Sequence, residues 1–195
     1  MISVIIGTEN SEHSLVPTLA ALVAGAAAGI VRDVIVADAG SRDATSEIAD
    51  LAGCTLIVSK APLATRLNEA AERARASWLM FLPPGVVLDA TWIDETRRFI
   101  ETAELSGAPT RAANFRRAPA VVQSRPLVLE ALMLLKSALG GRPHPEQGLL
   151  IPKHLYDQFG GHRGGAGNPQ ADLLARLGSK RILTLRSGAA KVAEN

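Results

Sequence analysis

Acidic and hydroxyl side chains follow the run "DVIVAD" at a spacing suited to holding a polar ligand. The run ends in Asp38, and the turn after it contains Gly40, Ser41, Asp43 and Thr45. The Asp38 carboxylate can accept hydrogen bonds from a nucleobase imide or a ribose hydroxyl, and Gly40 lets a ligand approach the backbone. Ser41 or Asp43 can cap the next helix. Ordinary turn chemistry fits the same spacing, with Asp38 accepting bonds only from backbone amides.

A second stretch, "WLMFLPPGVV", leaves an apolar run without an acid, base or thiol at its exit. Pro83, Pro84 and Gly85 follow Leu82 directly. Proline has no N–H and offers only its carbonyl oxygen, so this exit is poor in groups for proton transfer or for holding a cation.

Basic side chains in or near predicted loops are candidates for binding an anionic ligand, because guanidinium groups match phosphate oxygens. They are Lys60, Arg66, Arg116, Arg117, His162 and Arg163. Taken singly, each also fits a surface charge or an ordinary loop residue. The last two are the better candidates, because a Gly-Gly turn presents them and a glycine-rich segment follows.

The elements that must position these residues alternate between strands and helices. Four apolar runs, "ISVIIG", "DVIVAD", "TLIVS" and "WLMFL", predict strands, with helical stretches between them. Continuous apolar strands indicate a parallel sheet covered by helices on both faces, so we predict an α/β fold. Ligands of such folds bind where the strands end. That rule gathers residues 7–10, 38–43, 59–66 and 83–85 into one candidate site.

The second half is less regular. Asp89 is expected to cap a helix that runs to Leu105, with Trp92, Phe99 and Ile100 on its inner face. After a glycine-rich loop, "NPQADLLARLG" predicts a short helix and "RILTL" a strand.

Two long apolar segments allow more than one interpretation. Residues 15–31 carry no charge, but Pro17 near their start and their Ala- and Gly-rich composition favour a buried crossover helix over a membrane span. The segment from Pro126 to Leu139 is apolar almost all the way round. A buried helix fits it, and so does a helix that contacts a membrane surface or a partner protein.

Size and composition indicate one globular domain. The 195 residues are 47% hydrophobic and 21% charged, with a net charge of +2. This mildly basic balance favours phosphate-bearing small molecules or an anionic membrane surface over nucleic acid. The single Cys54 excludes a disulfide framework and indicates a core thiol in a reducing compartment, so we expect a cytoplasmic protein, with the inner membrane surface as an alternative.

In combination, these motifs resemble the family 2 glycosyltransferases of the GT-A fold, which transfer sugars from nucleotide-diphosphate donors. Thr8 and Asn10 match the family's Thr-x-Asn turn, although Gly7 replaces the usual proline. The turn after the second strand matches the family's D-x-G-S-x-D-x-T signature, and "PEQGLLIPKHLYDQFGG" resembles a pattern in short bacterial members. The resemblance implies a three-layer α/β/α sandwich with a mostly parallel sheet. Residues 1–88 would form its nucleotide-binding half and residues 89–195 its acceptor-side half.

The resemblance also implies roles for individual residues. A nucleotide-sugar donor and an acceptor would be the partners, with Asp38 nearest the base. The residues assigned to nucleotide binding in this way are Thr8, Glu9, Asn10, Asp38, Gly40, Ser41, Arg66 and Asn68.

Two family motifs are missing. The D-x-D motif, whose carboxylates hold Mn²⁺ or Mg²⁺ on the donor, falls on Pro83, Pro84 and Gly85, so we predict no metal site and no cofactor. The late Glu-Asp pair, whose acid deprotonates the acceptor, falls on Pro169 and Gln170.

Other residues are candidates for the missing functions. Asp172 and Glu146 are candidate bases, and Asp172 also fits a solvated acid in a first helical turn. His162 and Arg163 are candidate cations that take over the work of the metal. Dinucleotide, P-loop and serine-hydrolase motifs are absent from the sequence.

Three functions therefore remain. The first is a metal-independent glycosyltransferase. The second is a catalytically inactive protein that still binds a nucleotide sugar. The third is a scaffold or membrane-surface partner that uses the segment from Pro126 to Leu139.

Overall fold

β-branched and aromatic residues form the central strands of the computed structural model, which describes residues 1–107, 109–118, 143–165 and 167–192. The strands are β1 (Ile2–Thr8), β2 (Val31–Asp38), β3 (Thr55–Val58), β4 (Trp78–Phe81), β5 (Val86–Leu88), β6 (Ala112–Arg117), β7 (Leu149–Pro152) and β8 (Ile182–Lys191). The helices are α1 (Glu12–Ala27), α2 (Thr45–Leu51), α3 (Leu63–Arg73), α4 (Trp92–Leu105), α6 (Lys153–Gln158) and α7 (Pro169–Leu177). Two 3₁₀ turns are η1 (Pro145–Gln147) and η2 (Ser179–Arg181).

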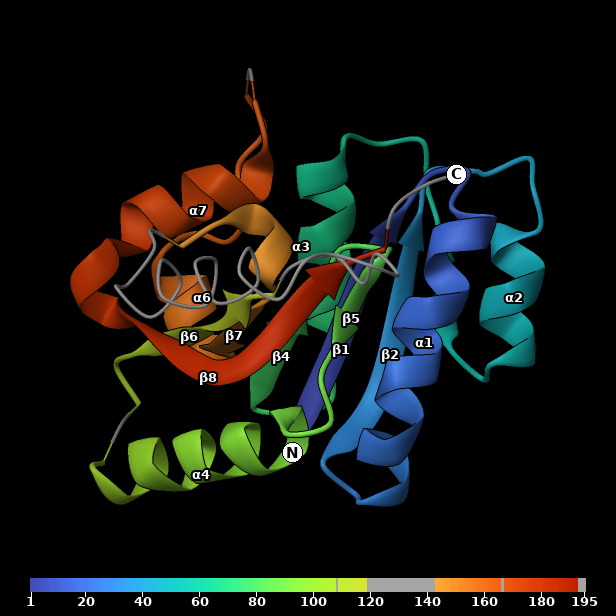
Figure 1. Cartoon of the computed structure of the whole chain (residues 1–195). Coiled ribbons are helices and arrows are strands. Elements are labelled where there is room, and N and C mark those ends of the chain that lie inside the picture. The colour runs from blue at the N-terminus through green and yellow to red at the C-terminus, as the bar shows by residue number, and fades with distance from the viewer. Residues whose placement is uncertain (108, 119–142, 166, 193–195) are drawn as a thin grey trace, which may run out of the picture.

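In the described ranges the strands form one eight-stranded sheet in the order β3-β2-β1-β4-β7-β6-β8-β5 (Figure 1). Strands β3, β2, β1 and β4 run parallel, and the pairing turns antiparallel between β4 and β7. Strands β6 and β8 are parallel to each other, while β5 runs antiparallel to β8 at the far edge. The predicted α/β fold with a mostly parallel sheet is confirmed, and both predicted halves contribute strands to it.

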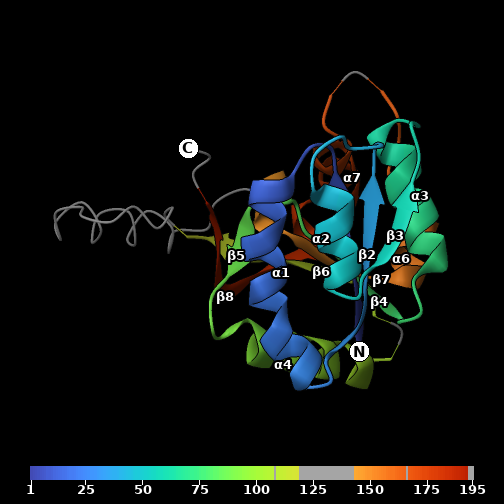
Figure 2. The ribbon, with the colours of Figure 1, turned by 90° about the vertical axis from the view of Figure 1, so that its right-hand side faces the viewer.

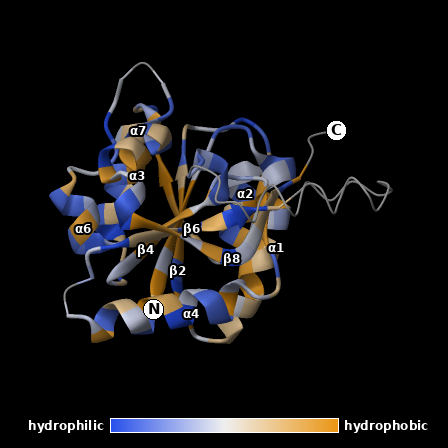
Figure 3. Cartoon of the chain, turned by 60° about the vertical axis from the view of Figure 1, so that its left-hand side comes forward, coloured by the Kyte–Doolittle hydropathy of each residue, from blue (hydrophilic) through white to orange (hydrophobic). Residues whose placement is uncertain are grey.

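A hydrophobic cluster covers each face of the sheet. One cluster packs the sheet against α1, α2 and α4, and the other packs it against α3, α6 and α7. Side chains of β1 alternate between them, since Val4 and Ile6 belong to the first cluster and Ile5 to the second. Figure 2 shows the two groups of helices on either side of the sheet, and Figure 3 shows the apolar strands at the centre. The three predicted layers are therefore present.

Helix α4 ends at Leu105 as predicted and buries Trp92, Phe99 and Ile100, but Asp89 does not cap it. The Asp89 carboxylate accepts a hydrogen bond from the Thr91 amide at 2.9 Å and another from the Gly188 amide. Helix α4 begins only at Trp92, so Asp89 lies before it and links the segment that precedes the helix to strand β8.

The crossover helix expected within residues 15–31 is confirmed as α1, which joins the parallel strands β1 and β2 and ends at Ala27. In the described part of the chain no helix is long and apolar enough to cross a bilayer. Other expectations change. Arg116 and Arg117, predicted in or near loops, lie on strand β6. Strand β7 was not predicted either. The segment from Pro126 to Leu139 lies outside the described residues.

Contact between α1 and α4 depends on the absence of a side chain at Gly25. A Cβ atom there would lie 2.4 Å from two ring carbons of Trp92 and 3.1 Å from a methyl group of Val31. The Trp92 indole is 2% exposed, so it has no free space into which it could withdraw.

We expect Gly25→Ala to destabilise the protein by about 1–3 kcal/mol, even though alanine is the better helix former, because the methyl group overpacks the core. Chemical denaturation measures this change. Gly164→Ala is the control, since nothing lies within 4 Å of a Cβ at that position, and it should change the free energy of unfolding by less than ~0.5 kcal/mol. Equal stability of the two variants would contradict the packing described for Trp92.

Candidate functional site

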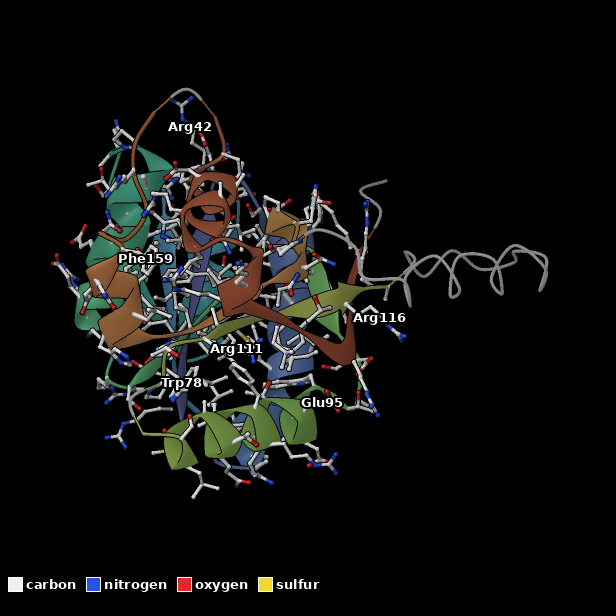
Figure 4. All side chains as sticks on the ribbon, turned by 90° about the vertical axis from the view of Figure 1, so that its left-hand side faces the viewer. Arg42, Trp78, Glu95, Arg111, Arg116 and Phe159 are labelled. Carbon is white, nitrogen blue, oxygen red and sulfur yellow. The ribbon has the colours of Figure 1, made fainter. Side chains whose placement is uncertain are left out.

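Strand register brings the predicted ligand loops to one edge of the sheet. In the pairing of β1 with β2, Thr8 lies opposite Asp38, the last residue of each strand. The parallel strand β4 ends beside them, and the Leu82 amide donates to the carbonyl of Ile5 at 3.0 Å. Figure 4 shows the labelled Arg42 at this end of the molecule and Trp78, the first residue of β4, toward the other.

Asp38 is fully buried and accepts hydrogen bonds on both carboxylate oxygens. Oδ1 accepts from the hydroxyl of Thr8 at 2.8 Å and from that of Ser41, while Oδ2 accepts from the amides of Gly40 and Ser41 at 2.8 and 2.7 Å. Burial by itself would raise the pKa of Asp38, but these hydrogen bonds outweigh it and hold the pKa below its ordinary value. The carboxylate is therefore ionised and shapes the loop. A ligand would have to take the place of one of these donors to bond it.

The remaining residues of the same signature tie this loop to the one after β1. The Asn10 amide donates to the Ser41 hydroxyl at 2.8 Å, and the Asn10 side chain accepts from the Arg42 amide at 2.9 Å. Asp43 accepts from the Glu12 amide at 3.0 Å, and Glu12 accepts in return from the Ala44 amide at 2.9 Å. The starts of α1 and α2 thus satisfy each other's free amides, which fixes the spacing of the two loops.

Arg66 joins the same group from α3 and is 4% exposed. Its Nη1 donates to the carbonyl of Thr8 at 2.9 Å and to that of Ala37, and its Nε donates to the carbonyl of Ala61 at 3.1 Å. Burial lowers the pKa of Arg66, and the nearby charges of Asp38 and Glu9 oppose that shift. The guanidinium therefore clamps the ends of β1 and β2, and Glu9 stays exposed beside it.

Asn68 lies in a different cluster, with Tyr156, His162 and Gln170. Its Nδ2 donates to the His162 carbonyl at 2.8 Å, and its Oδ1 accepts from the Tyr156 hydroxyl and from the His162 amide. The ring nitrogens of His162 lie 2.8 Å from the Tyr156 hydroxyl and 2.8 Å from the Gln170 amide oxygen. We call these four residues the Asn68 cluster. It fastens α3 to α6 and to the loop before α7.

His162 is 2% exposed and packs edge-on against Phe81, with ring centroids 4.6 Å apart. Burial lowers the pKa of His162 to about 4, so the imidazole is neutral at pH 7. It therefore differs from the exposed cation suggested by its glycine-rich loop. Tyr156 and Gln170 provide the partners that make its burial possible.

One polar atom of the Gln170 side-chain amide has no hydrogen-bond partner in the described residues. Gln170 is 8% exposed, and no hydrogen-bond partner for its Nε2 exists in the described residues. Because the phenol proton of Tyr156 goes to Asn68, His162 Nδ1 must carry its own proton and leave Nε2 as an acceptor for the Gln170 amide. Whichever way the amide is turned, one of its polar atoms remains free for another hydrogen bond.

A cavity of about 220 Å³ opens between this cluster and the ends of β1 and β4. Its floor is apolar, and the polar residues in its lining are Glu146, Asn168, Gln170 and Lys191. Pro83 and Pro84 line it as well, so the exit noted in the sequence faces this space. The cavity is therefore the candidate site for the reacting part of a ligand.

Glu146 is held at the cavity by its neighbour Gln147. The Gln147 side chain accepts from Asn114 Nδ2 at 2.9 Å, and Asn114 Oδ1 accepts from the Thr184 hydroxyl at 3.0 Å, so η1 is fastened to β6 and β8. Glu146 Oε1 in turn accepts from Lys191 Nζ at 2.8 Å. That bond is the main reason why the pKa of Glu146 lies below its ordinary value.

Other predicted residues lie apart from the cavity. Asp172 is exposed on α7 and pairs with Arg176 at 2.8 Å, which is the solvated first-turn acid considered above. Arg163 and Lys60 are exposed and do not line the cavity, and Arg117 is exposed on β6. Cys54 precedes β3 and is only partly buried against a hydrophobic cluster, rather than in the core as predicted, and this burial raises the pKa of its thiol to about 11.

The cavity contains few groups that could bind a divalent cation. Among the described residues that line it, Glu146 is the one carboxylate, and it already accepts a hydrogen bond from Lys191. Across the described part of the chain, no group of three or more His, Cys, Asp or Glu side chains could hold a metal ion. These donors do not fit the manganese or magnesium site that the resemblance implies.

Comparison with known proteins gives the class. The family described as Glycosyl transferase family 2 matches residues 3–109, which is more than half of the chain. The chain therefore belongs to glycosyl transferase family 2, as the motifs at Thr8 and Asp38 predicted. No curated protein sequence matches it.

Solved structures of glycosyltransferases share the fold at low identity. The 1–349 fragment of S. aureus TarS in complex with UDP-GlcNAc superposes with a TM-score of 0.70 and 15% identity, over 100% of this chain and 59% of that one. Glucosyl-3-phosphoglycerate synthase from Mycobacterium tuberculosis, with Mn²⁺ and UDP-glucose, gives 0.64 and 17% over 100% of this chain and 71% of that one. The fold is thus GT-A-like, and the chain spans about three fifths of the TarS fragment.

Because His162 is neutral when folded, we expect acid to weaken the protein through this residue. The unfolded chain binds the His162 proton below its ordinary pKa of 6.5, whereas the folded one resists it until about pH 4. Stability should therefore fall between these pH values by up to roughly 3 kcal/mol. Denaturant unfolding of the wild type and His162→Gln at pH 7 and 4.5 isolates this contribution, since the variant should lose less stability. Parallel losses would contradict the burial of an uncharged ring.

Proposed function

We propose that this chain transfers a sugar from a nucleotide-diphosphate donor to an acceptor hydroxyl without a metal ion held by a D-x-D motif. The observation that carries the proposal is the cavity beside the ends of β1 and β4, which contains a carboxylate and a cation where the family has a carboxylate-bound metal. S. aureus TarS in complex with UDP-GlcNAc has the same fold, which supports a nucleotide-sugar donor.

In this reaction the acceptor oxygen attacks the anomeric carbon of the donor sugar. The bond between that carbon and the diphosphate oxygen breaks, and the nucleoside diphosphate leaves with the bonding electrons. The proton of the acceptor hydroxyl passes to a carboxylate, and Glu146 is the carboxylate among the described residues that line the cavity. Asp172 is the weaker candidate because Arg176 holds it on the exposed side of α7.

The nucleotide would bind at the loops that Asp38, Thr8 and Arg66 hold together. Since these three side chains are engaged with the chain itself, we propose that they position backbone and loop groups around the base and ribose. Glu9, Asn10, Gly40 and Ser41 lie in the two loops that they hold. Asn68 would act indirectly, by fixing the wall of the cavity that includes Gln170.

A second function is a protein that binds a nucleotide sugar without turnover. It is favoured by Gln170, whose amide stands where the family has an acid and cannot accept a proton at neutral pH. The bond of Glu146 to Lys191 also favours it, because that bond makes the carboxylate a weaker base.

Metal independence is measured by calorimetry. We expect UDP or GDP to bind with an affinity that changes by less than about threefold between 1 mM Mn²⁺ and EDTA, because the cavity has too few oxygen ligands for the ion. A large gain in affinity with Mn²⁺ would contradict the proposal. Release of free sugar from the donor by the same sample separates the transferase from the inactive binder.

The nucleotide loops are tested with Asp38→Asn, which removes the negative charge and puts an NH2 donor in place of a carboxylate oxygen that accepts two hydrogen bonds. We expect a loss of at least about tenfold in nucleotide affinity together with lower stability. Asp33→Asn is the matched control, because Asp33 is also a hydrogen-bonded carboxylate on β2 but accepts from Ser3 near the start of the sheet. It should lower stability and leave nucleotide binding unchanged. Equal affinities of the two variants would place the nucleotide elsewhere.

A further inference from the structure

The charges at the cavity come from one pair of residues. Of the described residues that line it, only Glu146 and Lys191 are charged, and their side chains are bonded at 2.8 Å. We call them the Glu146–Lys191 pair. The two residues lie far apart in the sequence, because Glu146 is in η1 and Lys191 is the last residue of strand β8.

Strand pairing brings Lys191 to the exit where the family has its metal ligands. Val86, the residue after the Pro83–Gly85 exit, pairs with Lys191, and the Val192 amide donates to the Gly85 carbonyl at 2.8 Å. Gly85 is fastened to α1 in turn, because its amide donates to the Ser14 carbonyl and the Thr18 hydroxyl, each at 2.9 Å. The backbone of Lys191 thus has a fixed place beside this exit, and its side chain lines the cavity together with the two prolines.

The exit itself cannot bind an anion. Pro83 and Pro84 have no N–H, and the Gly85 amide is already bonded to α1. A diphosphate next to Pro83 and Pro84 would face carbonyl oxygens, which repel it, and would therefore need a cation nearby. Among the described residues that line the cavity, Lys191 is the one cation.

The other basic side chains are less suitable. Arg66 uses Nε and Nη1 on backbone carbonyls, and His162 is buried and neutral. Lys60 and Arg163 are exposed and do not line the cavity. The side chains of Lys191 and Glu146 are 49% and 35% exposed, and a solvent-screened pair of that kind is weak, so a diphosphate can displace the carboxylate.

We propose that Lys191 binds the donor diphosphate in place of the missing metal, and that this binding withdraws Lys191 from Glu146 and leaves the carboxylate free to accept the acceptor's proton. The proposal rests on the proposed function. In the empty protein the pair is closed. When the donor binds, the ammonium neutralises the leaving diphosphate, and Glu146 becomes available at the same moment.

The movement of Lys191 from Glu146 to the diphosphate changes the pKa of Glu146. The hydrogen bond from Lys191 is the main cause that lowers the pKa of Glu146, and the charges of His144 and Arg117 act in the same sense. Loss of that bond, together with the arrival of a diphosphate, must raise the pKa and make Glu146 a stronger base. Donor binding therefore prepares the carboxylate, and without donor the base stays weak.

The first test measures the binding of UDP and of uridine in EDTA by calorimetry. Lys191→Met should lower the affinity for UDP about tenfold or more and leave uridine binding unchanged, while Lys191→Arg keeps most of the UDP affinity. Lys180→Met is the control, because it removes the same charge from an exposed residue just before the other end of β8. A UDP affinity of Lys191→Met equal to that of the control would overturn the proposal.

The second test concerns competition for Lys191. Glu146→Gln removes the carboxylate that holds the ammonium, so it should tighten UDP binding severalfold, and this gain should shrink in the Lys191→Met background. The same gain in both backgrounds would mean that Glu146 merely repels the nucleotide, and the exchange would be refuted. Carbon-13 NMR of Glu146 should show its pKa rising when UDP binds, and an unchanged pKa would refute it too.

The outcomes separate the two proposals. If the wild type binds neither UDP nor GDP, the proposed function fails and this inference fails with it. If the wild type binds UDP while Lys191→Met binds it equally well, the donor site stands and only the role of Lys191 is overturned.

Discussion

The pairing of Thr8 with Asp38 at the ends of β1 and β2 is the constraint on which the site depends. It brings a buried carboxylate under two backbone amides and two hydroxyl groups, and it lets Arg66 reach the carbonyls of both strands. Each of these polar groups would be costly to bury without its partners, so the groups stabilise one another. This cluster of hydrogen bonds sets the distance between the two loops that precede α1 and α2.

A second set of polar contacts supports the side of the cavity formed by η1 and the start of α7. The Asn68 cluster joins α3, α6 and the start of α7, and the bonds from Gln147 through Asn114 to Thr184 join η1, β6 and β8. Between the two sets of contacts lies an apolar floor, and the charged residues of its described lining form one ion pair, Glu146 with Lys191. This arrangement fixes the spacing of the loops after β1 and β2 and leaves a weaker, solvent-exposed contact at the cavity.

The sequence predicted the parallel core well, because runs such as "ISVIIG" and "DVIVAD" are continuous and β-branched. It also predicted the loops around Asp38, because the spacing of Gly40, Ser41 and Asp43 reflects bonds within a short turn. Strands β5, β6 and β7 escaped prediction, since "VVL" and "LLIP" are very short and "AANFRR" has no apolar period. Tyr156 and Lys191 were not predicted as site residues, because their roles depend on contacts with residues far away in the sequence. His162 was misjudged because a glycine-rich turn usually exposes its residues.

Strand β5 is three residues long and lies at the outer edge of the described sheet, yet its pairing with β8 is what places Lys191. Short edge strands open more readily than central ones, so the ammonium group is in place only while this edge is closed. Occupancy of the cavity and protection of the edge amides from solvent exchange are thermodynamically linked. Any change that frays the Val86–Leu88 ladder would weaken a ligand held by Lys191 without touching it.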